Sequence, residues 1–145
     1  MELKKSEFYT APQLAVAEGR EVAIHFDAEQ VEVPDTSNAT QQPSSTDEDP
    51  QESRAVPTKT IIQAYTVRVQ QPLGKDKIVN AIVSAAYPSD KMQAIINNHF
   101  LNLAAQQEGE ALDADEQAHE QEYHQMQEWR KYAKQIAVQV LAYME

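Results

Sequence analysis

The sequence predicts an α+β protein in which a small antiparallel β-sheet carries a three-helix C-terminal half that includes one long C-terminal helix. Apolar residues alternate with polar ones near residues 21–33 and 60–69, which is the period of a half-buried strand. After residue 74, apolar residues instead recur every three or four positions in three successive stretches, which is the period of an amphipathic helix. Both patterns together favour α+β over an all-helical or all-strand fold.

The N-terminal part predicts a β segment over residues 1–33. Residues 22–26 alternate apolar and polar side chains, and the alternation resumes at residues 31–33. The polar stretch 27–30 between them predicts a turn, and therefore a short hairpin. Upstream, residues 11–19 predict a brief helix that ends at a glycine.

Residues 34–58 differ in composition from the rest of the chain and predict a linker. Prolines punctuate a run of Ser, Thr, Asp, Glu and Gln that contains few apolar residues. Such a segment cannot bury enough apolar surface to offset the entropy lost on ordering. The expected organisation is therefore an N-terminal β segment at 1–33, an acidic Pro/Ser/Thr-rich linker at 34–58, and a strand plus three-helix domain at 59–145.

Two of the three helices follow the second predicted strand. The first is expected from Lys75 to Ala86, because the residue before Pro88 disfavours helical backbone. The second is expected over about residues 90–103, with an apolar stripe of five side chains. That stripe consists of Met92, Ile95, Ile96, Phe100 and Leu103.

The third helix is expected from Asp113 to about Tyr143. Asp113 and Glu116 have the spacing of a capping box, in which each side chain accepts a hydrogen bond from the backbone N–H of the other residue. Its polar first turns, residues 116–122, are expected to face solvent or a partner. Farther along, apolar side chains spaced three and four residues apart form a heptad seam from Met126 to Tyr143.

That seam carries the candidate partner-binding residues. The seven candidates are Tyr123, Met126, Trp129, Tyr132, Ile136, Val140 and Tyr143. The spacing alone leaves open whether the seam packs on the chain's own helices or on a neighbouring molecule. Trp129 has the same two interpretations, a core anchor or a binding hot spot, since tryptophan is enriched at hot spots.

The charge pattern excludes some partners. A net charge of −11 argues against binding nucleic acid, whose phosphates would be repelled. Residues 59–103 are mildly basic at +3 (5 basic, 2 acidic), and the segments around them are acidic. This balance serves solubility, or it provides an acidic surface for a basic partner.

The sequence contains no residues with the spacing that known catalytic, cofactor-binding or metal-binding motifs require. His119 and His124 lie five residues apart, which places them about 140° apart around a helix and prevents them from sharing a zinc ion. A single Glu116-x-x-His119 pair lacks the second pair of a di-iron site. The chain has no cysteine and three glycines, so a thiol nucleophile is excluded and tight phosphate-binding loops are not expected. We therefore expect no enzyme, no cofactor, no metal and no small-molecule substrate.

The termini and composition also limit the expected location. The first seven residues lack an apolar run after their lysines, so they do not predict a signal peptide. No stretch of about 18 apolar residues predicts a transmembrane segment. The lack of cysteine favours a reducing compartment or a metal-free assembly.

Three stretches carry a resemblance to a known class of proteins. They are residues 89–98 (SDKMQAIINN), the pair Glu122-Tyr123, and residues 126–134 (MQEWRKYAK). With these stretches, residues 61–143 resemble small structural or tail-fibre-assembly-type proteins of tailed phages and prophages of Bacteroidales. The resemblance brings no active-site residues.

The resemblance implies a non-enzymatic virion structural or assembly protein of the neck, tail, fibre or capsid. Its partners would be other virion proteins or further copies of itself as a homo-oligomer, with no membrane involved. It would act in the virion or the host cytoplasm. The alternative hypothesis, motivated by the acidic stretch at 104–122, is an acidic host-directed adaptor or inhibitor that binds a basic partner.

Overall fold

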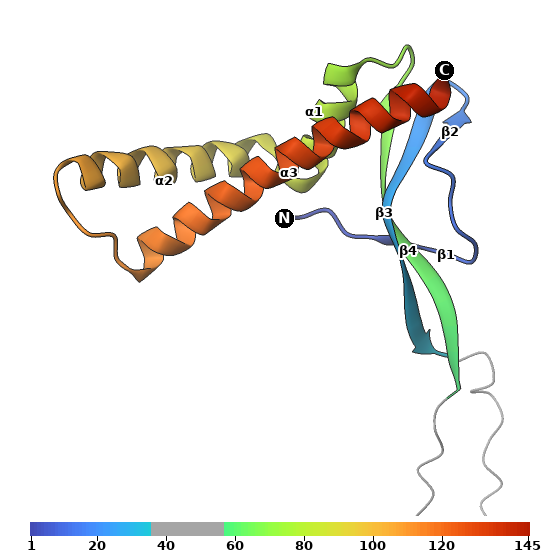
Figure 1. The fold of residues 1–145 in the computed structure, drawn as a ribbon, viewed down its shortest axis with the longest axis horizontal. Helices are drawn as coiled ribbons and strands as arrows, with labels where there is room; N and C mark the ends of the chain where they lie inside the picture. The colour runs from blue at the N-terminus through green and yellow to red at the C-terminus, as the bar shows by residue number, and fades with distance from the viewer. Residues whose placement is uncertain (36–56) are drawn as a thin grey trace, which may run out of the picture.

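The computed structural model describes residues 1–35 and 57–145, and it confirms the α+β class. Seven elements follow one another, four strands and then three helices (Figure 1). The strands are β1 (Ser6–Phe8), β2 (Ala15–Glu18), β3 (Glu21–Pro34) and β4 (Thr58–Gln70). The helices are α1 (Lys75–Ala86), α2 (Ser89–Gln107) and α3 (Ala114–Met144).

The four strands form one antiparallel sheet in the order β1-β4-β3-β2. The long β3–β4 pair is its centre, and it runs from Glu21 opposite Gln70 to Pro34 opposite Thr58. β4 lies between β1 and β3, so segments 1–33 and 59–145 share a single sheet.

The predicted hairpin at residues 27–30 is wrong, because β3 continues through this stretch as one strand. The register with β4 shifts between Phe26 and Glu29, which marks a β-bulge. Asp27 adopts a left-handed conformation with φ 54°, which aspartate tolerates better than most residues. Lys5 holds the bulge from β1's side, with its Nζ 3.0 Å from Asp27 and 3.1 Å from Glu29. The polar run thus bends a strand instead of reversing it.

The predicted helix at residues 11–19 is also wrong. The stretch contains β2, whose residues pair with β3 from Ala15 opposite Ile24 to Glu18 opposite Glu21. Gly19, with φ 66°, lies in the tight turn between the two strands. The glycine that suggests a helix end is a hairpin glycine instead.

The helices match their predicted ranges closely. α1 occupies the predicted range, while α2 and α3 extend slightly past theirs. The capping box is confirmed: Glu116 N donates to Asp113 Oδ1 at 2.8 Å, and Asp113 N donates to Glu116 Oε1 at 3.2 Å.

The main core lies where α1 and the C-terminal half of α3 pack on the sheet. Its side chains from the sheet alternate along the strands, and those from the helices recur every three or four residues. The central buried set is Val22, Ile24, Phe26, Val67, Val69, Ile78, Ile82, Ala133, Ile136, Ala137 and Val140. A smaller cluster of Ala86, Tyr87, Ile95 and Met126 joins α2 to the middle of α3.

Two parts of the molecule project from this core (Figure 1). One is the helical arm, which we define as residues 95–107 of α2 and 114–123 of α3. The other is the far end of the β3–β4 pair, beyond the bulge. The predicted linker begins and ends on this ribbon, where Asp35 N donates to Pro57 O at 2.7 Å. Residues 36–56 of the predicted linker lie outside the described residues.

Within residues 1–35 and 57–145, no helix combines the length and apolar character needed to cross a membrane.

Candidate protein interaction site

The heptad seam of α3 packs mainly inside the chain. Met126 and Val140 are 0% exposed and Ile136 is 4% exposed, so these three predicted partner-binding residues are not accessible to a partner in this fold. The physical reason is that α1 and the sheet cover Ile136 and Val140, while Tyr87 after α1 and Ile95 of α2 cover Met126. Of the two interpretations that the spacing left open, the structure shows packing on the chain's own elements.

Trp129 lies where the two apolar clusters meet and is half-buried. Its indole Nε1 donates to Ile82 O at 3.1 Å, which ties α3 to α1. Its ring centroid lies 5.4 Å from that of Tyr65 and 5.7 Å from that of Tyr132. These are the distances of favourable aromatic pairs. Trp129 of α3 thus contacts both α1, through Ile82, and β4, through Tyr65.

The remaining predicted residues lie near or at the surface. Tyr132 is half-buried beside Trp129, and Tyr143 near the C-terminus is 49% exposed. Tyr123 stacks face to face on His99 of α2, with ring centroids 3.6 Å apart. The seven candidates are therefore spread over the core, the helical arm and the surface and do not form one patch.

The helical arm is held together by polar groups. Asn102 of α2 is 3% exposed, and its Nδ2 donates to Glu116 O at 2.9 Å and to Glu120 Oε1 at 3.1 Å. The same carboxylate lies 3.0 Å from His99 Nδ1. One side of the polar first turns of α3, with Glu116 and Glu120, thus faces α2 of the same chain. The other side, with Gln117, Gln121 and Glu122, is exposed to solvent as predicted. Hydrogen bonding offsets the cost of burying these groups but supplies little hydrophobic stabilisation.

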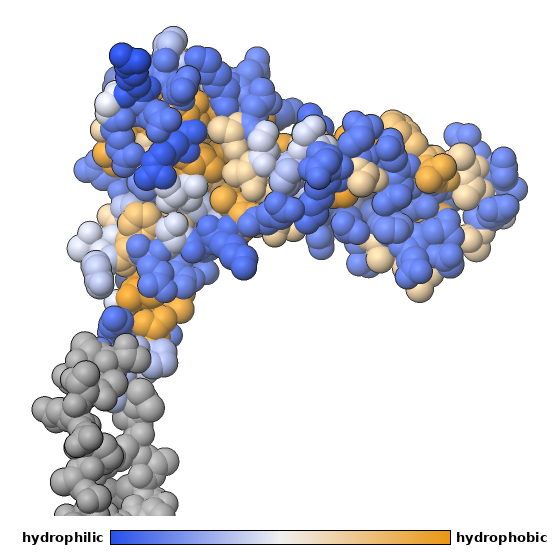
Figure 2. All heavy atoms as spheres, turned by 180° about the vertical axis from the view of Figure 1, so that it is seen from behind, coloured by the Kyte–Doolittle hydropathy of each residue, from blue (hydrophilic) through white to orange (hydrophobic). Residues whose placement is uncertain are grey.

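Three large apolar side chains are exposed on α2 in the helical arm, next to uncharged polar ones such as Asn97 and Gln106. Phe100 is 61% exposed, Leu101 69% and Leu103 39%. From Met92 to Gln107 the helix carries no Asp, Glu, Lys or Arg. We call Phe100, Leu101 and Leu103 the arm patch. Figure 2 shows apolar atoms at the surface of the projecting arm, among polar ones.

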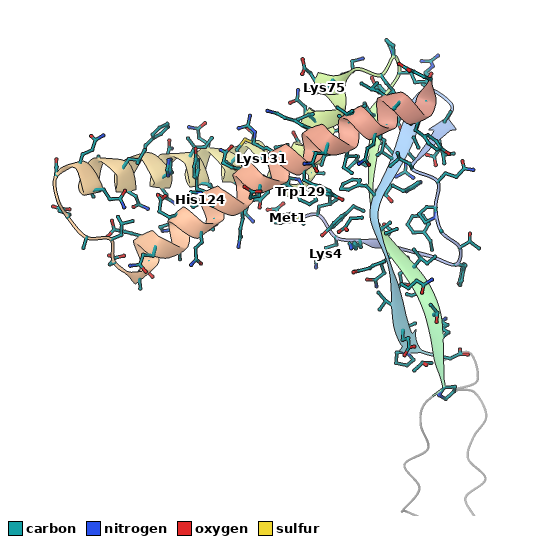
Figure 3. All side chains as sticks on the ribbon, viewed as in Figure 1. Met1, Lys4, Lys75, His124, Trp129 and Lys131 are labelled. Carbon is teal, nitrogen blue, oxygen red and sulfur yellow. The ribbon has the colours of Figure 1, made fainter. Side chains whose placement is uncertain are left out.

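A groove of about 650 Å³ runs beside α3, on the side where the N-terminal segment passes Trp129 (Figure 3). Its walls include Trp129 and Tyr132 of α3 and Tyr87 just after α1. Asp27 of the bulge, His124 and Glu128 also line it. Burial raises the pKa of Tyr87 and of Tyr132, so both hydroxyls are protonated at neutral pH. We call this feature the aromatic groove.

The histidines serve local packing and hydrogen bonding. His25 Nδ1 lies 2.9 Å from Thr66 Oγ1 on the opposite face of the sheet, and burial lowers the pKa of His25. His119 contacts Glu122 at 3.5 Å. In the two ranges that the structure describes, no three His, Asp or Glu side chains come together as metal ligands.

Sequence reasoning missed both surface features. The arm patch had a detectable signal, because sixteen residues without a formal charge are unusual in a chain that is 24% charged. The predicted stripe of α2 is confirmed at Met92, Ile95 and Ile96, which pack against the core. It is wrong at Phe100 and Leu103, which are exposed, because His99 and Asn102 meet α3 in this part of the helix. The aromatic groove had no such signal, since Asp27, Tyr87 and Trp129 meet only through the tertiary fold.

Comparison with protein-family models, with curated proteins and with solved structures gives no match to this chain.

Proposed function

We propose that this chain is a non-enzymatic structural or assembly protein of a phage virion that acts through protein–protein contacts of its helical arm. The arm patch is the single observation that carries the contact role. The assignment to a virion is supported by the resemblance of residues 61–143 to phage structural and tail-fibre-assembly-type proteins.

The arm patch has the character of a contact surface for two reasons. Large apolar side chains that are exposed close together on one helix segment are typical of a place where another surface binds. Here they also lie on a helix whose inner side is polar, with Asn102 and His99 facing Glu120. Phe100, Leu101 and Leu103 therefore add little to the packing of the arm itself, and a partner would bury them.

The shape of the molecule supports the same role. The helical arm projects away from the sheet, so the arm patch can enter a recess on a neighbour without a clash from the core (Figure 1). An apolar helix face that docks in a groove is a common mode of protein recognition.

The test is size-exclusion chromatography with light scattering on the chain, alone and mixed with candidate virion proteins. The test variant is Phe100→Gln with Leu101→Gln, which keeps helix propensity and adds no charge. The control is Val138→Gln with Met144→Gln, which also replaces two exposed apolar residues, 55% and 39% exposed, at the other end of α3. Circular dichroism confirms that both variants fold.

We expect the unmodified chain and the control to form a defined complex or oligomer, and the test variant to lose at least about 2 kcal/mol of binding, as for a hot spot. A stable monomer in every mixture would remove the proposal. A complex that survives the arm substitutions but dissolves in salt would favour the acidic adaptor instead, because exposed charge contacts are screened.

A further inference from the structure

We propose that the aromatic groove binds an arginine side chain presented by a basic segment of a partner protein. This inference goes beyond the proposed function, because it concerns a different surface from the arm patch and does not require that the partner be a virion protein.

The walls of the groove suit a flat cation. Trp129, Tyr132 and Tyr87 line it. Figure 3 shows Trp129 on α3 beside the N-terminal segment. A guanidinium group stacks on aromatic faces through electrostatic attraction to the ring, and Trp gives the strongest such contact. The indole N–H of Trp129 already donates to Ile82 O, so a ligand would meet the ring and not its polar edge.

The charges at the groove favour a cation over an anion or a neutral ligand. Asp27 and Glu128 supply two carboxylates to its rim, and Asp27 already pairs with Lys5 at 3.0 Å, which leaves Glu128 as the carboxylate for a ligand. Met1, His124 and Gln125 complete the lining beside the aromatic residues. Glu128 can also turn inward, since within residues 1–35 and 57–145 it pairs with Lys131 alone, at 3.2 Å between side chains that are 72% and 71% exposed, and such exposed pairs are weak. A carboxylate pairs with guanidinium through two parallel hydrogen bonds.

The chain already holds one cation in this manner next to the groove. The Lys5 ammonium lies 5.1 Å from the centroid of the Tyr65 ring and pairs with Asp27 and Glu29. Tyr65 in turn packs edge-on against Trp129, at 5.4 Å. The groove repeats that combination of aromatic ring and carboxylate, with Trp129 as the ring and Glu128 as the carboxylate.

The size of the groove also fits this occupant. The groove is shallow and open to solvent over a space of about 650 Å³, so a short stretch of backbone on either side of the arginine can lie along α3. The tyrosine hydroxyls of the walls can accept hydrogen bonds from the guanidinium N–H groups or donate to backbone carbonyls. An exposed loop or tail of a basic protein has this chemistry.

The experiment uses the full chain labelled with ¹⁵N and a synthetic peptide, acetyl-Gly-Arg-Gly-Arg-Gly-amide. Because Trp129 is the single tryptophan, its indole N–H gives one resonance that reports on the groove. The matched peptide replaces arginine with citrulline, which has nearly the same shape but no charge. The groove variant is Asp27→Asn with Glu128→Gln, because asparagine tolerates the left-handed backbone of position 27.

The control variant is Glu32→Gln with Glu110→Gln, which removes two negative charges from exposed positions that do not line the groove. We expect the arginine peptide to shift the Trp129 indole resonance to saturation in the unmodified chain and in the control. The groove variant is expected to bind at least about tenfold more weakly, as a lost charge-assisted contact predicts.

Three outcomes would overturn the inference. One is an equal response to the citrulline peptide, which would mean that charge is not recognised. Another is equal weakening in both variants, which would mean that only the net charge matters. The third is no shift of the indole resonance at about 10 mM peptide, well above millimolar dissociation constants. None of these outcomes bears on the arm patch, so the two proposals fail separately.

Discussion

Replacing Trp129 distinguishes a packing residue from a binding hot spot. Trp→Ala at a core site costs about 3–5 kcal/mol through lost burial and the cavity left behind. Trp129 is half-buried, so the lower end of that range, about 3 kcal/mol, is expected from packing. The hydrogen bond to Ile82 O adds about 1 kcal/mol. The total, about 4 kcal/mol, is a large share of the 5–15 kcal/mol typical of a domain.

The assay is urea unfolding followed by far-ultraviolet circular dichroism, since the variant lacks the fluorescent tryptophan. With a slope of about 2 kcal/mol per molar urea, Trp129→Ala is expected to lower the midpoint by about 2 M. Trp129→Phe keeps a ring in place but loses the hydrogen bond, so a smaller loss of about 1–2 kcal/mol is expected. An alanine variant that loses less than about 1 kcal/mol and fails only in assembly would refute the packing argument and make Trp129 a hot spot.

Two further predictions follow from burial and capping. Met126→Ala, at a fully buried site, is expected to lower the free energy of unfolding by about 2–5 kcal/mol. Tyr143→Ala, at a half-exposed site, is expected to change it by less than about 0.5 kcal/mol. Urea unfolding midpoints compare the two variants, and equal losses would contradict the core described here. The backbone N–H of Glu116 holds the pKa of Asp113 below its usual value, so the stabilisation by this cap is present above about pH 4 and is lost as the pH falls through the lowered folded pKa. Asp113→Asn still caps but does not titrate, so its unfolding midpoint is expected to fall less between about pH 5 and pH 3 than that of the unmodified chain; identical pH profiles would show that the cap contributes nothing.

Local patterns predicted the helices well because their signals are local. Pro88 stops α1, and the capping box starts α3 through contacts within four residues. The apolar face from Met126 to Val140 was predicted too, since its spacing depends only on helix geometry, but its residues were assigned to partner binding and not to packing within the chain.

The strand region was harder to predict because polar residues there have several uses. The Asp27–Gln30 stretch has the composition of a turn. After the bulge, however, β3 resumes its pairing with β4 at Glu29, so the two parts form one long strand. Ala15–Glu18 has no strong strand signal of its own, and its pairing with β3 determines its conformation.

The candidate site was the least predictable part. The sequence placed the aromatic side chains of α3 on a helix but could not say which would be covered by α1, the sheet or α2. Burial of Met126, Ile136 and Val140 follows from those tertiary contacts. The arm patch is exposed for a related reason. Asn102 and His99 of α2 make the polar contacts with Glu116 and Glu120 of α3, so Phe100, Leu101 and Leu103 lie on the exposed side of α2.

The sheet order makes the two halves of this chain mutually dependent parts of one structure. β4 belongs to the C-terminal half, yet it is bordered by β1 on one edge and β3 on the other, both from the N-terminal half. A chain cut anywhere within residues 36–56 would give two fragments in which one strand is inserted between two strands of the other. Each fragment alone would expose the apolar face that the other covers. The covalent connection therefore brings the halves together, while the two ladders that flank β4 hold them in place.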